Sequence, residues 1–362
     1  MSLKSFNSSL QRWQLSNLCL LSGIASSGTK AVMQSQLQTA LLRPRLPSKQ
    51  SRILSIDMGI KNLAFCVLDV DHQGWDAGNS KPRSVKSTAK TTPLRLSAWK
   101  RMDLTAILIE QHGKQQAVPK EEQQNSSDAD ASTPVDTKNL FSPSSLCKAA
   151  YTLASTLISY QPTTIIIERQ RFRSGGAAAI QEWTVRVNML ESMLWAILET
   201  MRHHLDPQKL PGGFPEMYEV SPRMVGLYWL GRPNGSQSLG PASGSELMPE
   251  TRPEAEDVNV VKKRAFEKKD KIALAKQWIK AAEIESDPQL ANLLEAVVSR
   301  GSKAAKLVRQ KDIGSEVQAN EKDASLTGKL DDLADCLVQA VTFTLWEENR
   351  RRLLKIINQT QT

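Results

Sequence analysis

The sequence predicts a mixed α/β fold in which one sheet is covered by helices. Two observations carry this prediction. Three β-prone segments follow one another at residues 52–57, 63–70 and 94–103. Amphipathic helical patterns and short apolar runs then alternate over the rest of the chain. Consecutive antiparallel strands followed by alternating helices and strands are typical of a mixed sheet flanked by helices.

The strands are predicted from apolar runs and the turns between them. Residues 52–57 (RILSID) and 63–70 (LAFCVLDV) are joined by five residues that include Gly59, which indicates a β-hairpin. Residues 94–103 alternate between apolar and polar side chains, as a half-exposed strand does. Residues 163–168 (TTIIIE) are continuously apolar, which is expected of a central strand buried on both faces.

Helices are predicted between and after these strands. Residues 143–160 and 180–201 carry apolar side chains at helical spacing. A short strand at residues 217–220 is followed by a Ser-Pro pair that suits the start of a helix. The last helix is predicted over residues 330–354. The helix at 180–201 is long enough for a subunit interface, and core packing explains it equally well.

Composition limits the classes of function. The 362 residues contain 47 Lys and Arg against 38 Asp and Glu, a net charge of +9 that favours nucleic acid as the partner. The sequence has no apolar run of about 18 residues, so no membrane association is expected. Its four cysteines form no CxxC pair and its four histidines no HExxH motif. Any metal should therefore be held by carboxylates, which favours Mg²⁺.

The main domain is predicted over residues 50–355, interrupted by polar insertions. These segments lack the periodicity of packed elements. They lie near residues 71–92, 112–138, 231–258 and 283–327.

The N-terminal segment supports two interpretations that are compatible. The first 50 residues contain six basic residues, ten serines and no acidic residue, which is typical of a mitochondrial transit peptide and predicts one at residues 1–14. A disordered basic tail is the alternative. Residues 15–48 suggest two short helices around a glycine turn and resemble the SAP motif, a small DNA-binding module. Lys30 in this module is a candidate DNA contact.

Isolated carboxylates fall at the ends of two predicted strands. Asp57 ends an apolar strand directly before a glycine turn, and Glu168 ends the most hydrophobic strand in the chain. Each could be an ordinary strand-end acid in a surface salt bridge. Together, at one rim of a sheet, they are candidates for metal ligands.

A third acidic element opens the last predicted helix, in the sequence KLDDLADCLV at residues 329–338. Helical spacing places Asp331 and Asp335 together at the edge of an apolar stripe, with Asp332 on the solvent side. An aspartate cluster that complements the helix dipole is the alternative, although it does not explain the face that Asp331 and Asp335 share. Convergence of these acids with the strand ends suits two divalent ions about 4 Å apart, as in phosphodiester hydrolysis.

Five motifs carry a family resemblance. They are SIDMGIKNLA at residues 55–64, IIERQRFR at 166–173, RVNMLE at 186–191, VSPR at 220–223 and KLDDLAD at 329–335. In this order they resemble the RNase H-like nuclease superfamily, and within it the fungal mitochondrial Holliday junction resolvases, relatives of the bacterial RuvC-type resolvases. The resemblance spans residues 52 to about 345 and departs from compact members in its long insertions.

The resemblance implies a homodimeric endonuclease of the mitochondrial matrix that resolves four-way DNA junctions by paired nicks. It implies two Mg²⁺ ions per active site, replaceable by Mn²⁺, and no nucleotide cofactor. The four catalytic acids of the family, which are also its metal ligands, correspond to Asp57, Glu168, Asp331 and Asp335. Their hydrolysis products would carry a 5′ phosphate.

Candidate DNA contacts are basic or polar residues beside the acids and in a second basic run. Fork-shaped guanidinium groups suit phosphates, although solvated charge explains such runs as well, and a tight turn alone explains the asparagine. The candidates are Lys61, Asn62, Arg169, Arg171, Arg173, Lys262, Lys263 and Arg264, besides the lysine of the SAP-like module.

Two other functions compete. Actin-like phosphotransferases also open with a strand, a DxG turn and a strand, but they need a second glycine-rich phosphate loop and an adenosine motif, and the sequence shows neither. A non-catalytic mitochondrial DNA-binding protein would use the SAP-like module and the basic runs. Such a protein has no use for four converging acids.

Overall fold

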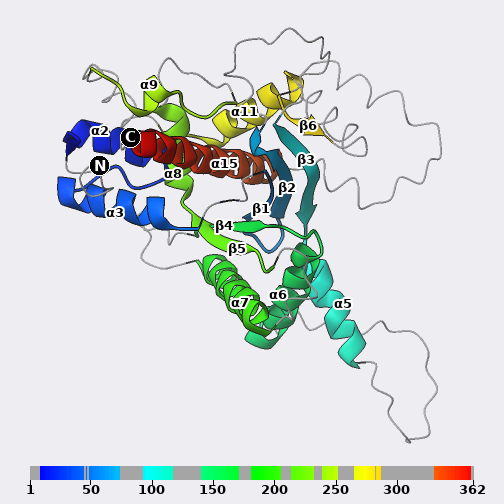
Figure 1. The fold of residues 1–362 in the computed structure, drawn as a ribbon. Coiled ribbons are helices and arrows are strands. Elements are labelled where there is room, and N and C mark those ends of the chain that lie inside the picture. Colours follow the sequence, from blue (N-terminus) through cyan, green and yellow to red (C-terminus); the bar gives the residue numbers. More distant parts are fainter. Residues whose placement is uncertain are drawn as a thin grey trace, which may run out of the picture.

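A six-stranded mixed sheet forms the centre of the protein in the computed structural model (Figure 1). The strand order is β5-β4-β1-β2-β3-β6. Strands β1, β2 and β3 pair antiparallel, whereas β4 is parallel to β1 and β5, and β6 is parallel to β3. The structure describes residues 9–44, 46, 49–73, 93–116, 140–170, 181–204, 213–231, 239–251, 265–281, 283–286 and 330–359. The predicted mixed sheet is confirmed.

Five of the six strands lie where the sequence predicts them. They are β1 (Gln50–Asp57), β2 (Leu63–Asp71), β3 (Leu94–Met102), β4 (Thr164–Glu168) and β5 (Glu216–Val220). The two-residue strand β6 (Glu285–Ser286) lies inside a segment predicted as an insertion. It is too short to give a periodic signal.

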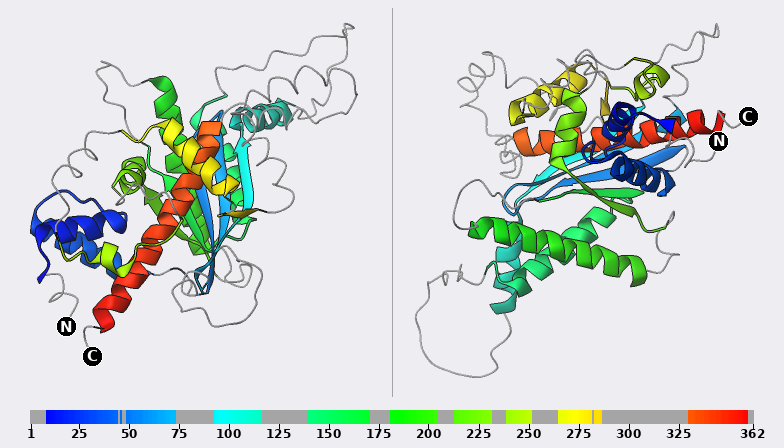
Figure 2. Two further views of the ribbon diagram at one scale, coloured as in Figure 1. Left: turned by 90° about the horizontal axis from the view of Figure 1, so that it is seen from above. Right: turned by 90° about the vertical axis from the view of Figure 1, so that its left-hand side faces the viewer.

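Helices cover both faces of the sheet, as the two views of Figure 2 show. On one face lie α5 (Leu104–Gln116), α6 (Pro143–Ile158) and α7 (Glu182–His204). On the other lie α2 (Arg12–Leu21), α3 (Lys30–Leu42), α8 (Pro222–Leu230), α9 (Gly244–Leu247), α11 (Lys268–Lys280) and α15 (Leu330–Gln359). None of these described helices is long and apolar enough to span a membrane.

The central strands are buried on both faces because each layer of helices has its own apolar core. In β1, Ile53 belongs to the cluster under α15, and Leu54 belongs to the cluster under α6 and α7. In β4, Ile166 faces the first cluster and Ile165 the second. This two-sided burial explains why the sequence of β4 is continuously apolar instead of alternating.

The N-terminal helices α2 and α3 are part of the main core. Leu15 and Leu37 are fully buried in the same cluster as α15. The Asn349 Nδ2 on α15 donates to the Leu21 carbonyl at 2.8 Å, and Arg43 forms an ion pair with Glu347. The two predicted short helices are confirmed, and α2 begins inside the segment predicted as a transit peptide. The module therefore packs on the C-terminal half of α15.

Three predicted insertions contain ordered elements. The helix α5 extends into the segment predicted at 112–138, and α9 lies within 231–258, where Ala242 and Leu247 are buried against the core. Strand β6 lies within 283–327. The elements α9 and β6 were missed because they are too short to give a periodic signal, and α5 was missed because its apolar residues lie only in its first half. Within the four insertions the structure describes residues 71–73, 112–116, 231, 239–251 and 283–286, and the others lie outside the described residues.

Candidate metal centre

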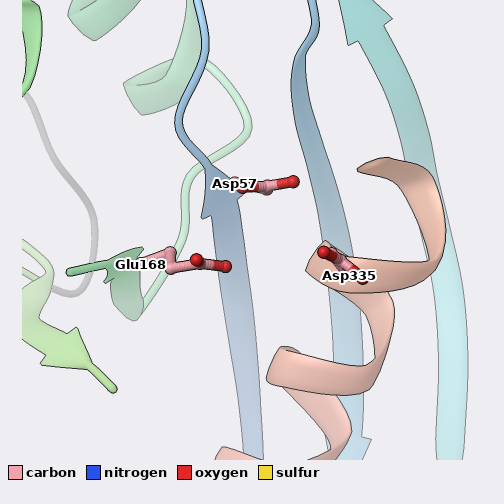
Figure 3. Close-up of side chains that lie close together, drawn as sticks. All are labelled: Asp57, Glu168 and Asp335. Atoms are coloured by element: carbon pink, nitrogen blue, oxygen red, sulfur yellow. The ribbon is translucent and has the colours of Figure 1, made fainter. Parts of the chain in front are cut away.

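Three carboxylates from different elements meet at one edge of the sheet (Figure 3). Asp57 ends β1, Glu168 ends β4 and Asp335 lies in the second turn of α15. One oxygen of each carboxylate lies within 4.8 Å of the others. Because β1 and β4 are parallel neighbours, their carboxyl ends fall at the same edge, and α15 crosses that edge with its N-terminal turns.

Hydrogen bonds fix α15 against the strand ends. Gln339, one turn beyond the clustered aspartate, donates from Nε2 to the Ser55 hydroxyl at 3.1 Å and to the Ile56 carbonyl at 3.3 Å. Trp99 on β3 donates from Nε1 to the Leu333 carbonyl at 2.8 Å. All of these groups are buried, so the spacing between the helix and the strand that carry the acids is rigidly defined.

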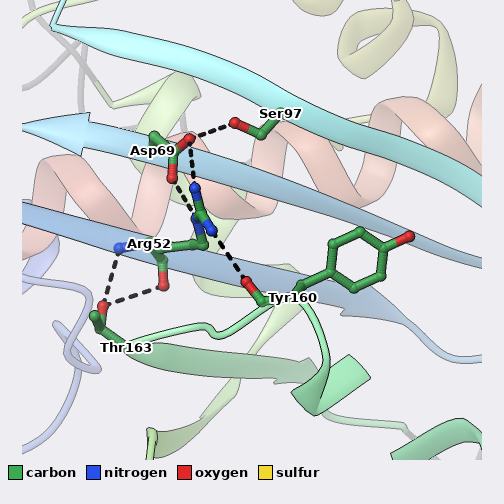
Figure 4. A network of polar contacts seen from close by, with 5 residues as sticks. All are labelled: Arg52, Asp69, Ser97, Tyr160 and Thr163. Carbon is green, nitrogen blue, oxygen red and sulfur yellow. Dashed lines mark hydrogen bonds and ion pairs between the residues drawn. The ribbon is translucent and has the colours of Figure 1, made fainter. Parts of the chain in front are cut away.

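A second network holds the beginnings of the same strands in register (Figure 4). Arg52 donates from Nε to Asp69 Oδ1 at 2.6 Å and from a terminal nitrogen to the Tyr160 carbonyl at 3.2 Å. Asp69 also accepts from Ser97 on β3. The Thr163 hydroxyl accepts from the Arg52 amide at 2.9 Å and donates to its carbonyl at 3.1 Å. Strands β1, β2, β3 and the entry to β4 are thereby tied together.

The three carboxylates repel one another in the absence of a cation. Burial raises the pKa of Asp57 well above its usual range, and the charges of Glu168, Asp335 and Asp332 raise it further. Burial also raises the pKa of Asp335, against the opposing effect of Lys271. Asp335 Oδ1 is buried and has no hydrogen-bond partner among the described residues. An acceptor-only oxygen set with an unused buried acceptor fits a hard divalent cation.

Two lysines of α11 face the aspartates of α15. Lys271 Nζ lies 2.8 Å from Asp335 Oδ2, and Lys268 Nζ lies 2.7 Å from Asp331 Oδ2. The first pair is largely enclosed, whereas Lys268 is mostly exposed. Burial by itself would raise the pKa of Asp331, but the hydrogen bond and charge of Lys268 outweigh it and lower that pKa.

The faces of α15 on which Asp331, Asp332 and Asp335 lie agree only in part with those predicted from helical spacing. Asp331 and Asp335 share the face that contacts α11, as their spacing predicts. Asp331 is not, however, a member of the three-carboxylate group. Asp332, expected on the solvent side, is half-buried with Oδ2 enclosed, and its charge raises the pKa of Asp57. Periodicity alone could not fix the rotation of α15 about its axis.

The candidate DNA contacts divide between described and undescribed residues. Lys61 is exposed and Asn62 half-buried in the β1–β2 turn, where a Cβ on Gly59 would lie 3.1 Å from the Asn62 backbone. Arg169 is exposed, and its Nη1 lies 3.4 Å from Glu219 Oε1 in an ion pair. Lys30 is exposed at the start of α3. The remaining candidates, Arg171, Arg173, Lys262, Lys263 and Arg264, lie outside the described residues.

Sequence reasoning missed three functions of individual side chains. Lys268 and Lys271 were not predicted to contact the acids, because their ion pairs with Asp331 and Asp335 join two helices that lie far apart in the sequence. Gln339 gave no signal, because a polar residue on a helix is ordinary in sequence. Its role is visible only through its buried contacts with β1.

The chain is similar to known proteins over most of its length. The family model described as mitochondrial resolvase Ydc2 / RNA splicing MRS1 matches residues 53–353. The chain is 29% identical over 216 residues to "Cruciform cutting endonuclease 1, mitochondrial" of Schizosaccharomyces pombe. That match covers 59% of this chain and 65% of the relative, so it spans just under two thirds of the relative's length.

A solved structure is similar over nearly its whole length. It is that of the yeast mitochondrial Holliday junction resolvase Ydc2, with a TM-score of 0.51 and 23% identity, covering 97% of this chain and 99% of that one. The likeness shows a shared fold, which is the RNase H-like mixed sheet that the sequence predicted.

Proposed function

Because the chain belongs to the family of mitochondrial resolvase Ydc2 and RNA splicing MRS1, we propose that it is a structure-selective endonuclease that resolves four-way DNA junctions. The observation that supports this most directly is the convergence of Asp57, Glu168 and Asp335 at one sheet edge. Three half-buried carboxylates that repel one another lower the stability of the metal-free protein, and DNA binding alone gives no reason to keep them. Metal-dependent phosphodiester hydrolysis gives the carboxylates a use, because they can hold the divalent cation.

We propose Mg²⁺ as the cofactor, replaceable by Mn²⁺, with Asp57, Glu168 and Asp335 as its ligands. A divalent cation supplies charge that activates the attacking water and offsets the charge developing on the phosphate. Lys271 fixes the orientation of Asp335 by holding its Oδ2. A fourth carboxylate would help to hold a second ion in the active site. Asp332, whose charge acts on Asp57, and Asp331, once released from Lys268, are the two candidates.

We propose a homodimer as the working form. A four-way junction has two equivalent strands to cut, and a two-fold dimer presents two sites to them. One face of α7 packs in the core through residues such as Leu190 and Leu194. A second face carries an open hollow that a second copy could cover, lined by Val185, Asn188, Met189, Ser192 and Met193. Sedimentation of the purified protein tests this assembly.

We propose that the reaction takes place in the mitochondrial matrix during DNA recombination; the names of the matched relatives support the mitochondrial part of this proposal. The proposed DNA contacts are the exposed Lys61 and Arg169, supported by the N-terminal module with Lys30. Charge reversal at Arg171 and Arg173 should flatten the salt dependence of binding, because fewer counterions are released. An unchanged slope would argue against phosphate contact by these arginines.

Incubation with a synthetic four-way junction, in Mg²⁺ or in EDTA, tests the activity. We expect paired nicks with Mg²⁺ and intact but bound junction with EDTA. A linear duplex of the same sequence and the Asp57→Asn variant are the controls, and both should stay uncut. Equal cleavage of the linear duplex would refute structure selectivity.

The family description also names RNA splicing, which provides a second candidate function. A splicing factor would bind structured RNA more tightly than junction DNA and would not need the carboxylates. Competition between structured RNA and junction DNA for binding to wild type and to Asp57→Asn separates the two candidate functions.

A third candidate function is actin-like phosphotransfer, which requires ATP. Nicking of the junction in the absence of ATP would exclude it.

A further inference from the structure

We propose that Trp183 forms a binding site for an unstacked nucleobase beside the metal centre, a proposal that rests on the junction-resolving function above. The site, here the Trp183 cluster, consists of Lys61, Phe141, Trp183 and Arg186. Its ligand class is a nucleotide whose base has lost a stacking neighbour, such as one at the centre of a four-way junction. Lys61 and, once released from its ion pair with Glu182, Arg186 would contact the adjoining phosphates.

The four side chains contact one another in series. Lys61 Nζ lies 5.7 Å from the centre of the Trp183 ring, and the Phe141 ring meets the indole edge-on at 5.7 Å and 75°. The Arg186 guanidinium lies over the Phe141 ring at 4.4 Å from its centre. Arg186 is also held by an ion pair with the exposed Glu182 one turn earlier on α7. Aromatic rings and cations thus alternate across the cluster.

Trp183 is not explained by core packing. Its side chain remains 38% exposed, and it lies outside both hydrophobic clusters of the sheet. Among the described residues, Tyr151 on α6 is the other large aromatic side chain that is exposed. An exposed indole supported by a second ring and two cations resembles the stacking surfaces of proteins that bind single-stranded nucleic acid.

The topology places this cluster at the edge that carries the carboxylates. Lys61 lies four residues after Asp57, in the turn that follows the end of β1. Glu168 ends β4 at the same edge of the sheet. The next described helix along the chain is α7, and Trp183 lies in its first turn. Contact between Lys61 and Trp183 therefore closes the turn onto α7 beside the metal centre.

A scissile phosphate at the carboxylates brings its neighbouring nucleotides to this edge. Within a duplex each base is stacked on both sides and offers no free face. At the exchange point of a junction, strands part and bases lose a neighbour, so an indole can replace the lost stacking. The cluster would therefore contribute to selection of the branch point, whereas the basic residues bind any duplex.

Fluorescence of 2-aminopurine tests the site in EDTA, where binding occurs without cleavage. One junction carries the analogue at the exchange point and another carries it within an arm. We expect wild type to quench the first and not the second. Trp183→Ala should abolish the quenching and weaken junction affinity about 5- to 150-fold, with little change for a linear duplex. Tyr151→Ala, the matched exposed aromatic, should behave as wild type.

The outcomes separate this proposal from the function on which it rests. Unchanged quenching and affinity in Trp183→Ala, with wild type active on junctions, would overturn the stacking site alone. Quenching by wild type without any cleavage in Mg²⁺ would overturn the resolvase function alone. A tryptophan-dependent signal only with structured RNA would overturn the junction assignment. If Trp183→Ala unfolds, Trp183→Leu keeps the apolar contact with Phe141, and its loss of quenching gives the same decision.

Discussion

Lys271 holds Asp335 by an enclosed ion pair, with 2.8 Å between Nζ and Oδ2 and 14% of each side chain exposed. This pair supplies one positive charge to a group of three carboxylates. The lysine therefore stabilises the metal-free protein and opposes a divalent cation at the same time. Lys268, one turn earlier on α11, forms the corresponding pair with Asp331 in an exposed setting.

Replacement of Lys271 should separate these two effects. We expect Lys271→Met to lower the free energy of unfolding in EDTA by about 3 kcal/mol, because it leaves an enclosed carboxylate without its partner. The same variant should bind divalent cations more tightly, since the competing charge is gone. Thermal melts with and without Mn²⁺ measure both. Lys268→Met is the control and should cost no more than about 1 kcal/mol; equal losses in both variants would contradict the difference in burial.

The raised pKa of Asp57 gives a pH dependence with a defined sign. The folded protein binds this proton more tightly than the unfolded chain, whose aspartate titrates near 3.8. Stability in EDTA should therefore fall as the pH rises from that value to the raised folded pKa, and then level off. Asp57→Asn should remove this component and make the metal-free protein more stable than wild type at neutral pH. Denaturant unfolding of wild type and Asp57→Asn across this pH range measures the difference. Parallel curves of stability against pH for the two proteins would contradict the prediction.

The three aspartates of α15 should differ in their effect on nicking. Asp335→Asn should abolish Mg²⁺-dependent cleavage, because its carboxylate is part of the three-acid group. Asp332→Asn should reduce the rate about 10- to 100-fold, since this side chain lies half-buried and acts on Asp57. Asp331→Asn should cost less than about tenfold. Rates at saturating Mg²⁺ decide the order, and a greater loss for Asp331→Asn would restore the pairing predicted from helical spacing.

The N-terminal module should be inseparable from the core. Gly23 has a φ of 71°, and a Cβ there would lie 2.4 Å from the ring of Trp346 on α15. Gly23→Ala should therefore destabilise the whole protein by about 2 kcal/mol or more, through backbone strain and overpacking. Gly244→Ala is the control, because its Cβ would meet nothing within 4 Å. A normal denaturation midpoint for Gly23→Ala would show that the module moves independently.

Sequence predicted the strands of this protein well because their signals are local. The runs that became β1 and β4 are apolar on both faces, and burial between two layers of helices requires that. The acids Asp57 and Glu168 could be placed at one edge because strand ends are visible in sequence. Parallel neighbours then bring those ends together.

Rotation of α15 and its partners could not be predicted in the same way. The apolar stripe of this helix is broad, since most of its residues from Leu333 to Arg350 are buried. A broad stripe does not determine which of Asp331 and Asp332 faces the strand ends. In the structure, Asp331 faces α11 and contacts Lys268, and Asp335 contacts Lys271. These contacts could not be predicted because α11 and α15 are far apart in the sequence. The contact between Lys61 and Trp183 is equally non-local.

The docking of the N-terminal helices on α15 has a consequence for how the protein is made. The Leu21 carbonyl and the Asn349 amide that binds it are 328 residues apart, so the surface that covers α2 is synthesised long after α2 itself. Contacts of such sequence separation form slowly. Until then the parts of α2 and α3 that pack on α15 stay exposed and open to chaperones. Because this core is complete only when the last helix has been made, the N-terminal helices reach their final packing at the end of synthesis, however early they leave the ribosome.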